Sequence, residues 1–174
     1  MRVERRFLEI HPETPPEGMP VTALGYPPDQ WARMVENLER MGKAERIVFS
    51  ERTFTTNSHK ALLLAEAAKE EGSAVFEALN EGLFRAYFTE GRNIGDPEVL
   101  RDVAQAAGVP AGRLVQAWSD AAYEGRLAGY RETAARFGIT GIPLFILGGR
   151  WILEGAVPVE MLREAAKKIS AGKS

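Results

Sequence analysis

Apolar residues recur every three or four positions through most of the chain between Pro28 and Phe137, and glycine follows most of these runs. This spacing places apolar side chains on one face of a helix, and the Pro, Asn, Ser and Asp residues before the runs are common helix starts. The pattern therefore predicts a long block of helices. The predicted helices cover residues 28 to about 41, 58 to about 71, 73 to about 87, 97–107, 110 to about 118, 121–137 and, at the end of the chain, 159–169.

Two segments have the pattern of strands instead. Residues 2–10 (RVERRFLEI) alternate imperfectly between apolar and polar positions, which predicts a strand near the edge of a sheet. Residues 143–147 (PLFIL) form a continuous apolar run of strand length. Gly148 and Gly149 follow it and favour a two-residue hairpin turn, because glycine accepts positive φ, and the return strand begins at Trp151. Residues 45–50 fit either a strand or an extended loop.

Composition and charge narrow the class of protein. The length of 174 residues, with 45% hydrophobic and 26% charged residues, is ordinary for one soluble globular domain. The net charge of −2 argues against a nucleic-acid partner. No apolar run approaches the ~20 residues of a membrane span, and no apolar stretch follows Met1 as in a signal peptide. We therefore expect a cytoplasmic protein without a membrane partner.

The chain contains no cysteine. This excludes disulfides, thiolate catalysis and zinc–thiolate sites together. The two histidines, His11 and His59, lie 48 positions apart without further ligands at a suitable spacing, so we predict no metal site and no cofactor. The glycine-rich segments match neither a phosphate-binding loop nor a dinucleotide fingerprint. The acids of the predicted helices are interpreted as solvated faces: Glu66, Glu70, Glu71, Glu77 and Glu81.

Several segments, in the same order along the chain, together resemble the DsbA-type thioredoxin-fold proteins, in the FrnE-like branch, with the 2-hydroxychromene-2-carboxylate isomerases as relatives. Residues 7–18 resemble the second core strand of that family and its proline-rich exit, and Asn57 and Ser58 resemble the start of its first inserted helix. Residues 83–109 resemble the most distinctive stretch of the helical insertion. Residues 134–147 and 153–168 resemble the proline loop and the last strand and helix.

The resemblance implies an α/β fold: a thioredoxin-like (DsbA-type) core, truncated at the N-terminus, with a large all-helical insertion. The core would comprise residues 1–53 and 138–174, and the insertion residues 54–137. Family members begin with a strand followed by a CxxC, or a serine in the isomerases, at the start of the first helix. Met1 stands just before the counterpart of the second strand, so we expect this first unit to be missing. A genuine loss and a truncated gene product both remain open.

The resemblance also singles out Gly141, Ile142 and Pro143 as a ligand-binding loop. In the family the proline is cis, and the backbone groups of the residue before it pair with an extended peptide. We therefore predict that these three residues line a groove for a peptide or a small-molecule ligand. The alternative is that the loop is an inherited turn that only determines the fold. No catalytic residue is carried over to this chain by the resemblance.

A missing first strand would leave backbone groups unpaired beside residues 143–147. Either residues 2–10 move inward to pair there, or a partner chain covers the edge. We predict a homodimer that hides it.

The function predicted from the sequence is that of a redox-inactive DsbA-like protein with a binding or structural role. The alternative is a glutathione-linked or isomerase-type enzyme that uses the cleft between the core and the helical insertion.

Overall fold

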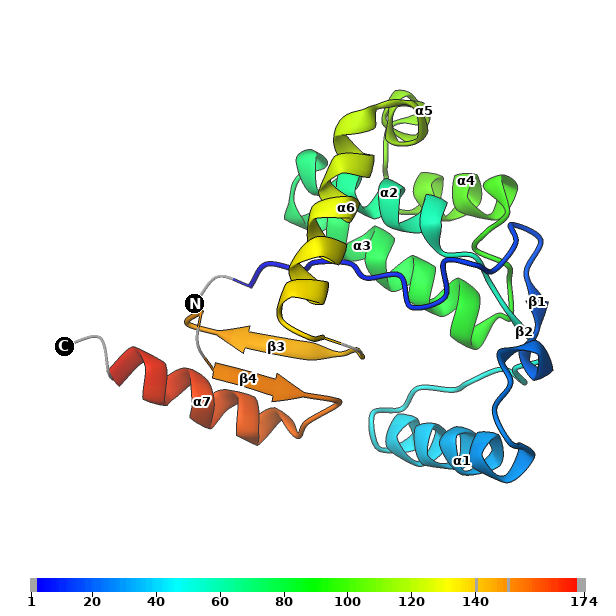
Figure 1. Ribbon diagram of the computed structural model, residues 1–174. Coiled ribbons are helices and arrows are strands. Elements are labelled where there is room, and N and C mark those ends of the chain that lie inside the picture. Colours follow the sequence, from blue (N-terminus) through cyan, green and yellow to red (C-terminus); the bar gives the residue numbers. More distant parts are fainter. Residues whose placement is uncertain (1–2, 140, 150, 172–174) are drawn as a thin grey trace. The chain divides into compact units, whose positions relative to one another are not determined.

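The structure is a computed structural model that describes residues 3–139, 141–149 and 151–171 (Figure 1). The chain packs as two compact units. One unit is formed by residues His11–Leu127, and the other by residues Met1–Ile10 together with Ala128–Ser174. Both units are built around elements that the apolar periodicity predicts.

The unit His11–Leu127 is almost entirely helical. Its elements are β1 (Met19–Pro20), η1 (Val21–Leu24), α1 (Pro28–Ala44), β2 (Phe54–Thr55), α2 (His59–Ala68), η2 (Lys69–Glu71), α3 (Ser73–Phe84), η3 (Arg85–Thr89), α4 (Pro97–Ala106), α5 (Ala111–Ser119) and most of α6 (Ala121–Arg136). The two short strands pair antiparallel, with Met19 opposite Thr55. The helical block predicted from the sequence is thus present, and η3 is a π-helical turn that continues α3.

Local sequence explains the helix starts in this unit. The Asp96 carboxylate accepts a hydrogen bond from the Glu98 backbone N–H at 2.9 Å, so it caps α4 as predicted. The Asn57 side chain accepts from the His59 N–H at 2.9 Å at the start of α2. Gly72, with φ 99°, rather than Ser73, holds the position before α3. The helices enclose a core whose largest fully buried apolar side chains are Leu64, Leu79, Leu100 and Tyr123.

The helix predicted over residues 28 to about 41, with Gly42 as its end, is longer than predicted. The helix continues to Ala44, and Gly42 is buried inside it. A Cβ atom at Gly42 would lie 2.4 Å from the Phe49 ring and 3.1 Å from the Ile47 carbonyl oxygen. The glycine therefore serves close packing of the following loop against α1, and the helix ends two residues later.

The second unit contains a β-hairpin and a C-terminal helix. Strands β3 (Leu144–Leu147) and β4 (Trp151–Glu154) pair antiparallel, with Ile146 opposite Ile152, and α7 (Val159–Ala171) follows (Figure 1). Gly148 and Gly149 have φ values of 60° and 74°, as the predicted two-residue turn requires. The predicted hairpin and final helix are therefore confirmed.

The predicted strand at residues 2–10 is not found. Arg2 lies outside the described residues, and no strand is assigned to residues 3–10. Val3 and Ile10 are exposed, and only Phe7, Leu8 and Glu9 are half-buried, so the segment has no continuous apolar face to pack as a strand. The alternative that this segment moves inward to pair with residues 143–147 stays a prediction. Among the described residues β3 forms a ladder with β4 alone.

The helices of the described residues are all too short or too polar to cross a bilayer. The division into a core of residues 1–53 and 138–174 and an insertion of residues 54–137 concerns the ancestry of the segments, and it stays a prediction.

Candidate functional site

The predicted ligand-binding loop, Gly141–Ile142–Pro143, leads directly into β3. All three residues are exposed, and Ile142 keeps 54% of its surface accessible. The peptide bond between Ile142 and Pro143 is cis. The Pro143 carbonyl oxygen accepts a hydrogen bond from the Gly155 N–H at 2.8 Å, which extends the hairpin pairing by one residue beyond β3 and β4. The loop is therefore fixed to a strand at its C-terminal side.

The backbone groups of Ile142 are the chemically significant part of this loop. Within residues 3–139, 141–149 and 151–171, neither the N–H nor the C=O of Ile142 has a hydrogen-bond partner. An exposed donor and acceptor on one residue can pair with a residue of an extended chain, as in an antiparallel ladder. The three residues named from the sequence therefore lie together and offer backbone recognition, without a reactive side chain.

The hairpin beside the loop exposes apolar side chains. Ile146 and Ile152 face each other across the strands and keep 47% and 48% of their surfaces accessible. Trp151 lies opposite Leu147, on the other face of the hairpin, and is 53% exposed. Leu147, which points to the opposite face of β3 from Ile146, is buried. One face of the hairpin is therefore free to contact a partner.

The histidines do not form a site. His11 Nδ1 lies 3.2 Å from the Glu13 carboxylate, and His59 Nε2 lies 2.9 Å from the Glu124 carboxylate. The two pairs share no residue. In the part of the chain that the structure describes, no three His, Asp or Glu side chains gather as metal ligands.

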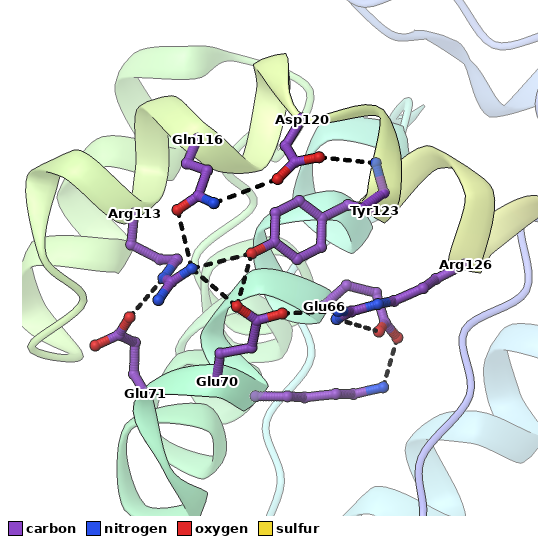
Figure 2. A network of polar contacts seen from close by, with 10 residues as sticks. Glu66, Glu70, Glu71, Arg113, Gln116, Asp120, Tyr123 and Arg126 are labelled. Carbon is purple, nitrogen blue, oxygen red and sulfur yellow. Dashed lines mark hydrogen bonds and ion pairs between the residues drawn. The ribbon is translucent and has the colours of Figure 1, made fainter.

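A network of charged side chains joins η2, α5 and α6 (Figure 2). The Glu70 carboxylate lies 2.9 Å from Arg113 and 2.8 Å from Arg126, and it accepts a hydrogen bond from the Tyr123 hydroxyl at 3.0 Å. The Glu71 carboxylate lies 2.5 Å from the Arg113 Nε. Glu70 is exposed as predicted, but its ion pairs were not predicted, and Glu71 is half-buried rather than solvated. The sequence periodicity carries no information on partners more than 40 positions away.

The interpretation of the neighbouring Glu66 as a solvated acid is wrong. Its side chain is 1% exposed, with Lys69 Nζ at 2.5 Å and Arg126 at 4.0 Å from its oxygens. Burying a carboxylate is costly unless cations neutralise it, and here they do. Glu77 and Glu81 are exposed as predicted. Because its charges neutralise one another, we interpret the network as a structural cluster rather than a reactive one.

The electrostatics of the network follow from these contacts. The hydrogen bonds from Arg126 and Tyr123 lower the pKa of Glu70 below its ordinary value of 4.5. Burial, followed by the hydrogen bond to Glu70, raises the pKa of Tyr123 above 10.0. The network therefore favours an ionised Glu70 and a neutral Tyr123 across the neutral pH range.

Comparison with known proteins places this geometry in context. A family model described as a DSBA-like thioredoxin domain matches residues 1–167. The thiol:disulfide interchange protein DsbA of Pseudomonas syringae pv. tomato is 28% identical over 79 residues, which are 45% of this chain and 33% of that protein. The crystal structure of a probable DsbA oxidoreductase from Streptomyces coelicolor superimposes with a TM-score of 0.85 at 26% identity. This match covers 97% of the present chain and 75% of the other.

Proposed function

Because this chain belongs to the family of DSBA-like thioredoxin domains, we propose that it is a binding protein of that fold, without thiol chemistry, which holds an extended peptide at Ile142. The fold is the DsbA-type α/β fold with a helical insertion, as the resemblance implies. The matched segment spans a third of the curated relative, so the activity of that whole protein is not transferred. The FrnE-like branch and a cytoplasmic location belong to this proposal as well.

The observation that carries the proposal is the pair of open backbone groups at Ile142. They sit beside a strand that already has a ladder on one side, so an incoming chain can continue the hydrogen bonding at that end of the hairpin. Cysteine is absent, which removes the attacking thiolate of disulfide exchange but leaves backbone recognition intact.

A titration with an extended peptide tests this function. We expect the amide signal of Ile142 to shift in an NMR spectrum as a peptide rich in β-branched residues is added, because its N–H gains an acceptor. The amide signal of Ile152 provides the matched reference, since Ile152 already pairs with Ile146 inside the hairpin. Shifts at Ile152 without a shift at Ile142 would contradict the proposal, as would the absence of any shift at Ile142.

A second copy of the chain is the partner that we propose for the exposed face of the hairpin. Ile146 and Ile152 each keep about half of their surface accessible, and a symmetric dimer would remove this apolar area from water. We expect light scattering at micromolar concentration to give twice the mass of 19.2 kDa, and Ile152→Glu to restore the monomer mass. A monomer of the unaltered chain would count against this partner.

The second candidate function is a glutathione-linked or isomerase-type enzyme. It rests on the resemblance to the isomerase relatives alone, and measurable glutathione affinity would favour it over peptide binding.

A further inference from the structure

Arg52 differs from the arginines of the charged network. Its guanidinium is half-buried, yet none of the described Asp or Glu side chains forms an ion pair with it. Among the described residues its side chain makes one hydrogen bond, a long one from Nη2 to the Tyr87 hydroxyl at 3.4 Å, and its buried Nε has no acceptor there. By contrast, Arg113 and Arg126 each have carboxylate partners. A half-buried cation without an anion is costly, so a counter-charge from outside the chain would be stabilised there.

Aromatic rings surround this cation. The Arg52 guanidinium carbon lies 5.3 Å from the centre of the Trp31 ring, 5.7 Å from that of Tyr87 and 5.5 Å from that of Phe88. The faces of these rings stabilise the cation and keep the planar guanidinium in place. Phe84 stacks on Phe88 at 5.8 Å and is itself 59% exposed, so the aromatic surface continues outward from the cation.

The backbone holds this arrangement together. Tyr87 and Phe88 belong to the π-helical turn η3, in which the Glu90 N–H bonds to the Arg85 carbonyl. The Phe88 carbonyl accepts instead from the backbone N–H of Ser50 at 2.7 Å and from its hydroxyl at 3.2 Å. The loop that carries Arg52 is therefore tied to the turn that supplies two of its rings. Single π-helical turns within helices are often found at functional sites.

We propose that Arg52 and these rings bind an acidic peptide segment, with an Asp or Glu carboxylate on the guanidinium and a neighbouring aromatic side chain against Phe84. Charge complementarity selects the acid, since the guanidinium fork matches a carboxylate and lacks one in the chain. The exposed Phe84 ring selects an aromatic neighbour. The site lies in the helical unit and is separate in the sequence from the backbone groups of Ile142, so it does not depend on the function proposed above.

The probe is a pentapeptide, Gly-Phe-Glu-Phe-Gly, blocked at both ends so that its single carboxylate is the glutamate side chain. The comparison peptide has glutamine in place of glutamate. NMR signals of the Arg52 Nε–H and the Trp31 indole N–H report binding at this place. We expect the glutamate peptide to shift both signals and to bind about tenfold more tightly than the glutamine peptide, the usual gain from a charge-assisted pair.

Variants decide whether the cation itself recognises the acid. Arg52→Gln is expected to abolish the tenfold preference, and Arg40→Gln, at an exposed arginine of α1, is expected to retain it. Arg52→Lys keeps the positive charge but lacks the planar N–H donors of the guanidinium, and it is expected to retain part of the preference. This variant tests the proposal if Arg52→Gln does not fold. Equal affinity of the unaltered chain for both peptides, no binding at millimolar concentration, or shifts at Ile142 with none at Arg52 would each overturn the proposal.

Discussion

Replacing Tyr123 with phenylalanine is expected to lower the free energy of unfolding by about 1–3 kcal/mol at pH 7. The side chain is 1% exposed, and its hydroxyl both donates to Glu70 and accepts from Arg113, each at 3.0 Å. Phenylalanine preserves the ring and its packing but leaves these two charged groups without the hydroxyl. Urea denaturation followed by circular dichroism measures the difference, with the slope of the transition as a check that the unfolded state is unchanged.

The pH dependence of this difference identifies the network as its cause. The pKa of Glu70 is lowered by its hydrogen bonds, so its contribution to stability is present above the unfolded value of 4.5 and is lost as pH falls through the lower folded value. The pKa of Tyr123 is raised by burial and by Glu70, so its contribution is present below 10.0 and is lost as pH rises through the higher folded value. The stability difference should therefore be largest between about pH 5 and 9 and shrink on both sides.

Tyr26→Phe is the matched control. The Tyr26 ring is 36% exposed and stacks on Trp31, and its hydroxyl has no hydrogen-bond partner among the described residues. The same chemical change there should alter the free energy of unfolding by less than about 0.5 kcal/mol. Equal effects of the two substitutions, or a Tyr123→Phe effect that does not change between pH 3 and 7, would show that the network does not carry the stability.

Elements whose stability is local could be predicted from the sequence. The start of α4 at Asp96 and Pro97 and the turn at Gly148 and Gly149 depend on residues within a few positions of each other, and the structure has them as predicted. The helical block follows from one periodicity, because each helix has to bury one face. Helix ends that depend on tertiary contacts could not be predicted. Gly42 is an example, because it allows the Phe49 ring to pack closely against α1 and does not end the helix.

Pairings over long distances along the chain could not be predicted. In the sequence, Glu66 and Glu70 have the pattern of ordinary surface acids. In the structure, Arg126 of α6 lies beside both carboxylates. Residues 3–10 are a different case: their alternation predicted a strand, and no strand is assigned to them. The surroundings of Arg52 could not be predicted either, because its aromatic neighbours belong to α1 and η3, which are distant in the sequence. The cis bond before Pro143 was indicated by family resemblance and by no local rule.

The absence of cysteine from this chain leads to a second prediction, which concerns thiol–disulfide exchange. Its fold is that of proteins described as thiol:disulfide interchange proteins and probable oxidoreductases, and the exposed loop at Ile142 is in place. Thiol–disulfide exchange proceeds by attack of a thiolate on a disulfide sulfur, through a mixed disulfide between the two proteins. With no cysteine in its sequence, this chain has no atom that can form that intermediate.

We therefore expect no catalysis of insulin reduction. In the presence of dithiothreitol, the onset and rate of insulin B-chain precipitation should equal those of dithiothreitol alone, at any concentration of the protein. The Pseudomonas syringae relative serves as the positive control in the same buffer. A rate that rises with the concentration of this chain would require a chemistry without thiolates and would overturn the proposed absence of redox function. Peptide binding at Ile142 together with an unchanged insulin assay would instead show that this loop binds a peptide backbone without a reactive sulfur. The N–H and C=O of Ile142 have no partner among the described residues, and their pairing with a peptide needs no thiol.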